Sequence, residues 1–223
     1  MLGDILLIRE IHSNAAEQIA KKVNSERSKK PKDYKFIVGL SGESGSGKSE
    51  LAHSLGLRLK KEHIRVKVLH TDNYYKVAPL LRSEWRKAKG IESVGMNEYD
   101  WNLIHRNIQD FKEDRESMVP CIDIIPEQVD KLITDFKKID LLILEGLYAI
   151  KSDGVDLRIF IELTNAETKP GGKETGTNEK SEFAKSVLEK EHLNIISLKP
   201  LSDIIINKGY QVLDAKTEVP IID

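Results

Sequence analysis

The stretch that decides the fold of this chain is Gly42-Glu43-Ser44-Gly45-Ser46-Gly47-Lys48-Ser49, followed by Glu50. Its spacing is G-x-x-x-x-G-K-S, the P-loop pattern, in which glycines let successive backbone N–H groups surround phosphate oxygens. The lysine of this pattern can reach the β- and γ-phosphates, and its serine hydroxyl can bind Mg²⁺. The stretch therefore predicts a site for a nucleoside triphosphate and magnesium.

The residues on either side of this loop supply the setting that it requires. Residues 36–40 form a short apolar run suited to a buried strand. After the loop, Leu51, Leu55 and Leu59 recur at helical spacing. A strand, a glycine-rich loop and a helix are thus expected in that order, and the helix N-terminus adds its positive end to the phosphate site.

Composition indicates a globular protein and excludes some functions. The chain has 223 residues, 39% hydrophobic and 32% charged, enough for one α/β domain with a small appendage. A formal net charge of −1 argues against bulk binding of nucleic acid. The single cysteine, Cys121, cannot form an internal disulfide and suits a reducing compartment. No run is long enough to cross a bilayer and no signal peptide is evident, so we expect a cytoplasmic protein.

The order of elements predicts a P-loop NTPase of the α/β class, with three α/β/α layers and a central, mainly parallel sheet. We expect further strands at 65–70, 139–144 and 157–161 and a last strand at 203–206, and helices at 101–111 and 183–188. Residues 76–98 are expected to be irregular, and residues 165–180 polar and mobile.

The chain is expected to divide into two parts. Residues 1–34 form an N-terminal unit, with an amphipathic helix over 2–24 and a polar linker, and residues 35–223 form the main domain. The helix is expected to pack on that domain or on a second subunit, which makes a homodimer a further expectation.

Two acidic residues follow predicted strands. Asp72 comes after the strand at 65–70, and Glu145 after the strand at 139–144. Because ligands collect at the carboxyl ends of parallel strands, both carboxylates are expected near the P-loop. One carboxylate can bind Mg²⁺, and one can position or deprotonate an attacking hydroxyl. Alternatively, each acid could be a helix cap or a turn residue.

These elements together resemble the uridine kinase and phosphoribulokinase family over about residues 35–207. Besides the P-loop, the similarity is carried by Thr71-Asp72-Asn73-Tyr74-Tyr75, Glu98-Tyr99-Asp100, Pro120-Cys121-Ile122-Asp123, Leu144-Glu145-Gly146-Leu147-Tyr148 and Leu201-Ser202-Asp203-Ile204-Ile205-Ile206. The resemblance implies an ATP-dependent kinase acting on a hydroxyl of a small molecule. By similarity, Lys48 stabilises the transferred group, Asp72 is the base, and Ser49, Asp72 and Glu145 form the magnesium site.

The acceptor region is expected to involve Tyr74, Tyr75, Arg82, Arg86, Asp100 and Asp123. By similarity, nucleoside-specific members have an acidic residue within the stretch that corresponds to residues 92–96, at a place where this chain has no acid, and a tyrosine where it has Ile122. The acceptor is therefore left open among a nucleoside, a sugar phosphate and a hydroxy acid. Arg82 and Arg86 could bind an anionic acceptor or lie on an exposed basic helix, and Asp100 could be only an N-cap.

The lid is expected to be poor in arginine, because no arginine follows Arg158. Its cations are the lysines Lys169, Lys173, Lys180 and Lys185, which could bind phosphate or form a solvated face. This leaves a second functional hypothesis, an ATP-binding regulatory module with weak or no kinase activity. A GTPase switch is disfavoured because Asn207-Lys208-Gly209-Tyr210 lacks the acid that reads guanine.

Overall fold

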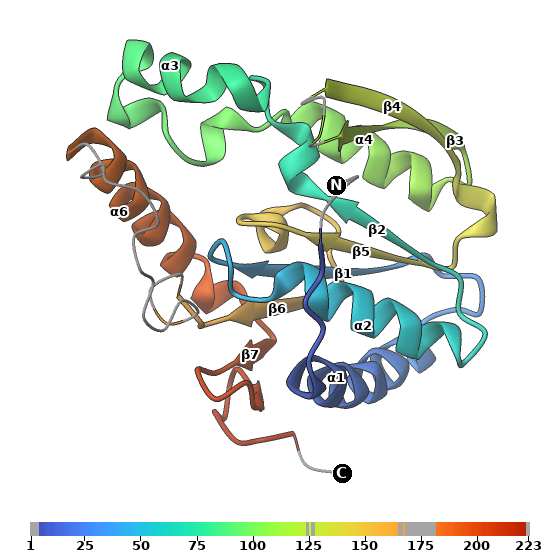
Figure 1. Cartoon of the computed structure of the whole chain (residues 1–223). Coiled ribbons are helices and arrows are strands. Elements are labelled where there is room, and N and C mark those ends of the chain that lie inside the picture. Colours follow the sequence, from blue (N-terminus) through green and yellow to red (C-terminus); the bar gives the residue numbers. More distant parts are fainter. Residues whose placement is uncertain (1–4, 124, 126–127, 165–166, 168–181, 222–223) are drawn as a thin grey trace.

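The computed structural model describes residues 5–123, 125, 128–164, 167 and 182–221. Its centre is a six-stranded sheet in the order β2-β5-β1-β6-β7-β8 (Figure 1). The strands are β1 Phe36–Gly42, β2 Val66–His70, β5 Leu141–Glu145, β6 Leu157–Ile161, β7 Ile204–Ile206 and β8 Val212–Asp214. All are parallel except β8, which pairs antiparallel with β7.

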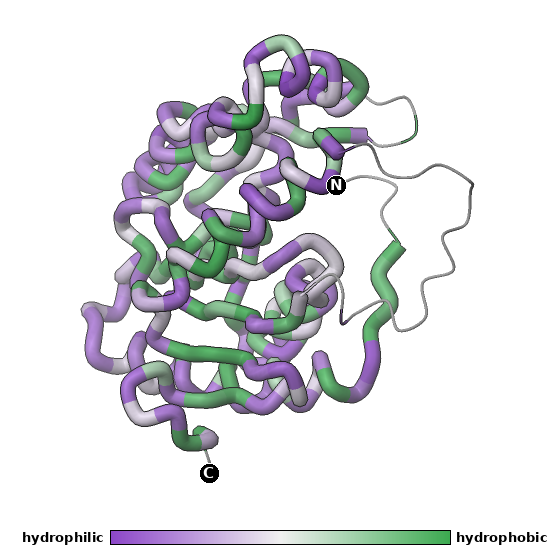
Figure 2. Tube along the Cα trace, turned by 90° about the vertical axis from the view of Figure 1, so that its left-hand side faces the viewer, coloured by the Kyte–Doolittle hydropathy of each residue, from purple (hydrophilic) through white to green (hydrophobic). Residues whose placement is uncertain are grey.

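Helices cover both faces of this sheet, so the expected three-layer fold is confirmed. Alternate strand residues point to opposite faces. On one face, Phe36 and Val38 pack with α1 (Glu10–Ser28) and α2 (Lys48–Lys60). On the other, Ile37 and Leu142 pack with α4 (Trp101–Lys112). Figure 1 shows α1 and α2 below the sheet and α4 above it, and the strands carry hydrophobic stretches in Figure 2.

The face that carries α4 also holds a second, two-stranded sheet. It is an antiparallel hairpin of β3 (Glu116–Asp123) and β4 (Gln128–Asp135). Sequence reasoning did not predict this hairpin, because most of β4 is exposed and lacks the apolar pattern of a buried strand. β8 was missed as well, so the strand at 203–206 is not the last one. The single cysteine, Cys121, lies buried in β3.

The prediction that residues 76–98 are irregular is wrong. They contain α3 (Pro79–Lys89), followed by short 3₁₀ turns at Ile91–Ser93 and Met96–Glu98. Proline at the first helical position and Gly90 after the last one are ordinary start and stop signals. Since every residue of α3 is at least partly exposed, the helix lacks the buried stripe on which the prediction relied. The helix expected at 183–188 is the longer α6 (Glu182–Ile196).

The N-terminal helix begins later than expected. Residues 5–9 are not helical, and α1 runs from Glu10 to Ser28, into the predicted linker. Of the expected apolar stripe, Ile5 is 82% exposed, whereas Ile19 and Val23 are fully buried against the sheet and α2. The structure thus shows the helix packed on the main domain, which is one of its two expected roles; packing on a second subunit stays a prediction.

Some expectations fall on residues outside the described part of the chain. The predicted mobile segment 165–180 and the lid lysines Lys169, Lys173 and Lys180 lie there, apart from residue 167. Lys185 is described and lies on α6. Within the described residues, we find no helix with the length and apolar character needed to cross a membrane.

Gly146 is the position where the fold most strictly requires glycine. Its φ is +151°, and a Cβ atom there would lie 1.8 Å from Thr71 Oγ1. Its backbone N–H donates to the carbonyl of Leu40 at 3.1 Å, which ties the end of β5 to β1.

We predict that Gly146→Ala lowers the free energy of unfolding by roughly 2 kcal/mol or more. The alanine would be held at an unfavourable positive φ, and its methyl group would also clash with Thr71. Gly56→Ala is the matched control, since a Cβ at this helical position meets only Val66 Cγ1 at 3.9 Å. That variant should be stabilised by about 0.5–1 kcal/mol. Urea unfolding of both variants provides the measurement, and equal stability of the two would contradict the prediction.

Candidate active site

The P-loop connects β1 to α2 at the carboxyl end of the sheet. Gly45 and Gly47 have positive φ angles of 81° and 89°, which turn the chain around a hollow of backbone N–H groups. Ser44 and Gly45 are exposed at the tip of the loop, whereas Ser46 is buried. Strand, loop and helix thus stand in the order that the sequence predicts.

Two side chains of the loop are placed to meet phosphate. Lys48 is 7% exposed, and its Nζ donates to the carbonyl of Glu43 at 2.8 Å, across the loop. The buried Ser46 Oγ has no hydrogen-bond partner among the described residues. Because buried polar atoms are ordinarily paired, an unpaired hydroxyl here fits a phosphate oxygen as its partner. Gly42 lies against Ser46, since a Cβ at Gly42 would be 2.9 Å from Ser46 Oγ.

Glu145 is brought to the P-loop by the strand register. β5 lies between β1 and β2, and Glu145 pairs with Leu40 on one side and His70 on the other. Glu145 Oε1 accepts a hydrogen bond from Ser49 Oγ at 3.2 Å and contacts His70 Nδ1. Burial raises the pKa of the Glu145 carboxyl, but His70, Lys48 and Ser49 outweigh that effect, and the net shift is downward.

Asp72 lies in the short 3₁₀ turn Thr71–Tyr74 that follows β2. Its carboxylate accepts a hydrogen bond from Tyr99 Oη at 3.3 Å. Burial is the largest cause of a raised pKa at Asp72; Lys48 lowers this pKa and Glu145 raises it. The two acids that the sequence singled out are therefore electrostatic neighbours with opposite pKa shifts.

The donor set fits Mg²⁺. Ser49 Oγ and Glu145 Oε1 lie within hydrogen-bond distance of each other, with Asp72 close enough to interact with Glu145 electrostatically. Hydroxyl and carboxylate oxygens are the ligands that Mg²⁺ prefers, and it usually takes only one or two protein carboxylates besides phosphates and water. The described residues contain no group of three or more His, Cys, Asp or Glu that could hold a metal ion. A magnesium site here would accordingly rely on phosphate oxygens as well.

The expected acceptor residues divide into two groups. Tyr75 and Arg82 lie beside Asp72: the Arg82 guanidinium is 3.4 Å from the centre of the Tyr75 ring, and Asp72 and Arg82 interact electrostatically. Tyr75 also stacks on Tyr99, with ring centres 4.2 Å apart. Among the described residues, the buried Arg82 Nε has no hydrogen-bond partner, which is unusual for a buried polar atom.

The other expected acceptor residues have partners within the protein. Tyr74 is buried and donates to Asn107 Oδ1 at 2.8 Å. Asp100 caps α4 by accepting from the Leu103 N–H at 3.0 Å. Asp123 ends β3 and accepts from the Ile125 N–H at 3.1 Å.

Arg86 takes part in an ion network with two glutamates. Its guanidinium donates to both carboxylate oxygens of Glu98, at 2.6 and 2.9 Å, and to Glu191 of α6 at 2.7 Å. Glu98 is 3% exposed. Removing one partner of a buried ion pair costs about 3–5 kcal/mol, so Arg86 has a structural task.

Sequence reasoning missed residues that the structure brings to this region. His70, the last residue of β2, could have been noted because it lies only two residues before Asp72. Glu191 and His192 are adjacent on α6; Glu191 reaches Arg86, and His192 Nδ1 lies 2.5 Å from Glu43 Oε1 in the P-loop. Nothing in the local sequence of α6 indicated these contacts, because they are set by how the helix packs.

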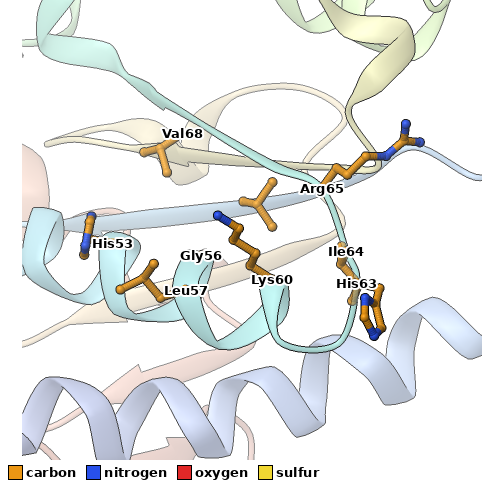
Figure 3. A pocket seen from close by; sticks show the side chains of 9 residues that line it. His53, Gly56, Leu57, Lys60, His63, Ile64, Arg65 and Val68 are labelled. Carbon is orange, nitrogen blue, oxygen red and sulfur yellow. The ribbon is translucent and has the colours of Figure 1, made fainter.

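A cavity of about 580 Å³ lies elsewhere, between α2 and the edge strand β2 (Figure 3). Its lining includes His53, Leu57, Lys60, Arg65 and Val68. Lys60 ends α2 and Arg65 precedes β2, so much of the cavity borders the amino ends of the strands. Ligands of such sheets bind at the opposite ends, which places the candidate site at the P-loop.

The fold and this loop are those of the P-loop NTPase class, and comparison with known proteins identifies the family. A model of the phosphoribulokinase/uridine kinase family matches residues 37–166, more than half of the 223 residues. The chain belongs to this family.

Individual relatives agree with this assignment. Over 137 residues the chain is 31% identical to a uridine kinase of Ureaplasma parvum serovar 3. The match covers 59% of this chain and 64% of that relative, so the chain spans less than two thirds of the relative's length. In fold it is similar to a "possible uridine kinase" from Bacillus stearothermophilus, with a TM-score of 0.61 and 18% identity over 86% of this chain and 97% of the other. It is also similar to a D-glycerate 3-kinase from Cryptococcus neoformans, with a TM-score of 0.59 and 13% identity over 92% and 98% of the two chains.

The lowered pKa of Glu145 predicts a pH effect on stability. A carboxyl whose pKa is depressed on folding stabilises the protein above its unfolded pKa, and this contribution is lost as pH falls through the folded pKa. We expect the unfolding free energy of the wild type to fall more steeply on acidification than that of Glu145→Gln, which cannot titrate. Urea unfolding at a series of pH values below 5 measures both slopes, and parallel curves would contradict the assigned pKa shift.

Proposed function

We propose that this protein is an ATP- and Mg²⁺-dependent kinase that transfers the γ-phosphoryl group to a hydroxyl of a small molecule. The observation that carries the proposal is the pair of acids beside the P-loop, whose pKa values are shifted in opposite directions. In such pairs, one carboxylate stays ionised during the reaction and the other takes up a proton. Glu145 suits the metal, and Asp72 suits the acceptor hydroxyl.

The roles of the side chains follow from their positions. Ser49 and Glu145 would hold Mg²⁺, which when bound neutralises charge on the phosphates. Lys48 would leave the Glu43 carbonyl for the phosphates and stabilise negative charge on the transferred group. As the acceptor oxygen bonds to phosphorus and the bond from phosphorus to the bridging oxygen breaks, Asp72 would take the hydroxyl proton. The raised pKa of Asp72 makes it a better proton acceptor at neutral pH.

The acceptor that best fits the described residues carries an anionic group. Among the residues that the structure describes, the buried Arg82 Nε beside Asp72 has no hydrogen-bond partner. Features that would favour a nucleoside are missing from the corresponding positions: Glu92 is paired with Lys190 at the surface, and Ile122 is 3% exposed in β3. A hydroxy acid or a sugar phosphate is therefore preferred over uridine, although the sequence relatives include a uridine kinase.

Asp72→Asn provides the first test. We expect kinase turnover to fall by 10²-fold or more, the usual scale for losing a general base. The folded variant should nevertheless be more stable than the wild type. Because the pKa of Asp72 is raised on folding, its ionised form costs stability as pH rises through the folded pKa, and the neutral amide avoids this cost. The melting temperature at pH 7 should therefore rise, by about 2–4 °C per kcal/mol for a chain of this size.

The measurement is ADP release with uridine, ribulose 5-phosphate and D-glycerate, together with thermal unfolding. If no acceptor raises ADP release and Asp72→Asn leaves basal hydrolysis unchanged, the kinase proposal fails and a nucleotide-binding regulatory module becomes the better description.

Arg82→Ala tests the choice of acceptor. A hydrogen bond to a charged group contributes about 1.5–3 kcal/mol, so KM for an anionic acceptor should rise roughly 10- to 100-fold, with a smaller change in KM for ATP. Arg106→Ala is the matched control, because Arg106 is exposed on α4. An unchanged acceptor KM in Arg82→Ala, or an equal rise in Arg106→Ala, would argue against an anionic acceptor bound by Arg82.

A further inference from the structure

Two residues far apart in the sequence meet at the last glycine of the P-loop. His12 lies in the first turn of α1, and Tyr210 lies in the turn between β7 and β8. Their side chains are 6% and 7% exposed, and their rings contact edge to face with centres 5.1 Å apart. Both residues lie outside the segment 37–166 that matches the family model.

Both side chains touch Gly47. Tyr210 Oη donates to the Gly47 carbonyl at 3.3 Å. A Cβ atom on Gly47 would lie 2.8 Å from Tyr210 Oη and 3.0 Å from His12 Nε2. The Gly47 carbonyl also accepts the helix bond from Leu51 N–H at 2.9 Å. Its orientation fixes the peptide that joins Gly47 to Lys48, and hence the Lys48 N–H at the start of α2.

Tyr210 is held in a costly backbone conformation. Its φ is +62°, in the left-handed region that bulky residues rarely adopt. The turn enforces this conformation, because Tyr210 N–H donates to the Asn207 carbonyl at 2.9 Å and Asn207 N–H donates to the Gln211 carbonyl at 3.1 Å. Such strain persists only where the surrounding structure holds the conformation in place, which is frequent at functional sites.

His12 is fixed from its other side. Its Nδ1 accepts a hydrogen bond from the Arg9 backbone N–H at 3.0 Å, so the ring proton is assigned to Nε2, the nitrogen near Gly47. Burial lowers the pKa of His12, Glu50 of α2 raises it, and Arg9 lowers it, with a net downward shift that favours the neutral ring. Glu50 also raises the pKa of Tyr210, to a smaller extent than burial does. Glu50, the residue that follows the P-loop, therefore lies close enough to interact electrostatically with both side chains.

We propose that His12 and Tyr210 are positioning residues that brace the P-loop through Gly47. They hold the Gly47–Lys48 peptide in the orientation that binds phosphate, and they make phosphate affinity depend on α1 and on the β7–β8 turn. The inference rests on the proposed function only in requiring that the P-loop binds phosphate groups. It assigns to the N-terminal helix a task at the nucleotide site.

The test is calorimetric binding of ATP–Mg²⁺ and of tripolyphosphate–Mg²⁺, which has phosphates but no base or sugar. Tyr210→Phe removes only the hydroxyl. Loss of one hydrogen bond of about 1 kcal/mol corresponds to a roughly fivefold weaker Kd, and we expect this for both ligands. His12→Asn, which keeps an acceptor for the Arg9 N–H but lacks Nε2, should weaken both ligands similarly and tests the brace from its opposite side.

Tyr34→Phe is the matched control. Tyr34 Oη also donates a hydrogen bond, to Asp156 Oδ1 at 2.7 Å, but Tyr34 precedes β1 at the far end from the P-loop. This variant should bind both ligands as the wild type does. Thermal unfolding of each variant verifies that it is folded.

The outcomes separate the brace from the proposed function. If the wild type binds ATP–Mg²⁺ and Tyr210→Phe and His12→Asn bind both ligands equally well, the brace is refuted while the kinase proposal stands. It is also refuted if only ATP binding weakens, because Tyr210 would then act on the base or sugar, and if Tyr34→Phe weakens binding as much. If the wild type binds neither ligand, the P-loop assignment itself is overturned.

Discussion

The rest of the site depends on the place of β5 between β1 and β2. This parallel pairing sets Glu145 beside Leu40, two residues before the P-loop begins, and beside His70, two residues before Asp72. One strand therefore brings the P-loop, Glu145 and Asp72 to one edge of the sheet. Gly146 completes the arrangement, because only a residue without a side chain lets the chain leave β5 past Thr71.

Much of the fold could be predicted because buried strands carry a local signal. Residues 36–40 and 157–161 are apolar runs, and a strand that is covered on both faces must be apolar throughout. The P-loop was recognisable because its spacing is dictated by phosphate geometry. The same reasoning failed for α3 and β4, because most of their side chains are exposed and the search relied on the apolar pattern of buried elements.

The candidate site was only partly predictable, and the boundary again has a physical reason. Asp72 and Glu145 could be found because strand ends are identifiable in sequence. Side chains that arrive from other elements, such as His12, Tyr210 and His192, could not be found, because tertiary packing alone brings them to the loop. Arg82 and Arg86 illustrate this further. Both are positively charged residues of α3, yet Arg86 is paired with Glu98 and Glu191, whereas Arg82 Nε has no hydrogen-bond partner within the described part of the chain.

The raised pKa of Asp72 also bears on what the chain has been selected to do. A protein that only bound nucleotide would become more stable by exchanging this carboxylate for a neutral group of similar shape, and random substitution offers many routes to such an exchange. Stability alone therefore does not account for an acid at this position. An acid beside Glu145 whose pKa is raised by burial fits a working kinase better than a binding module that has lost its reaction.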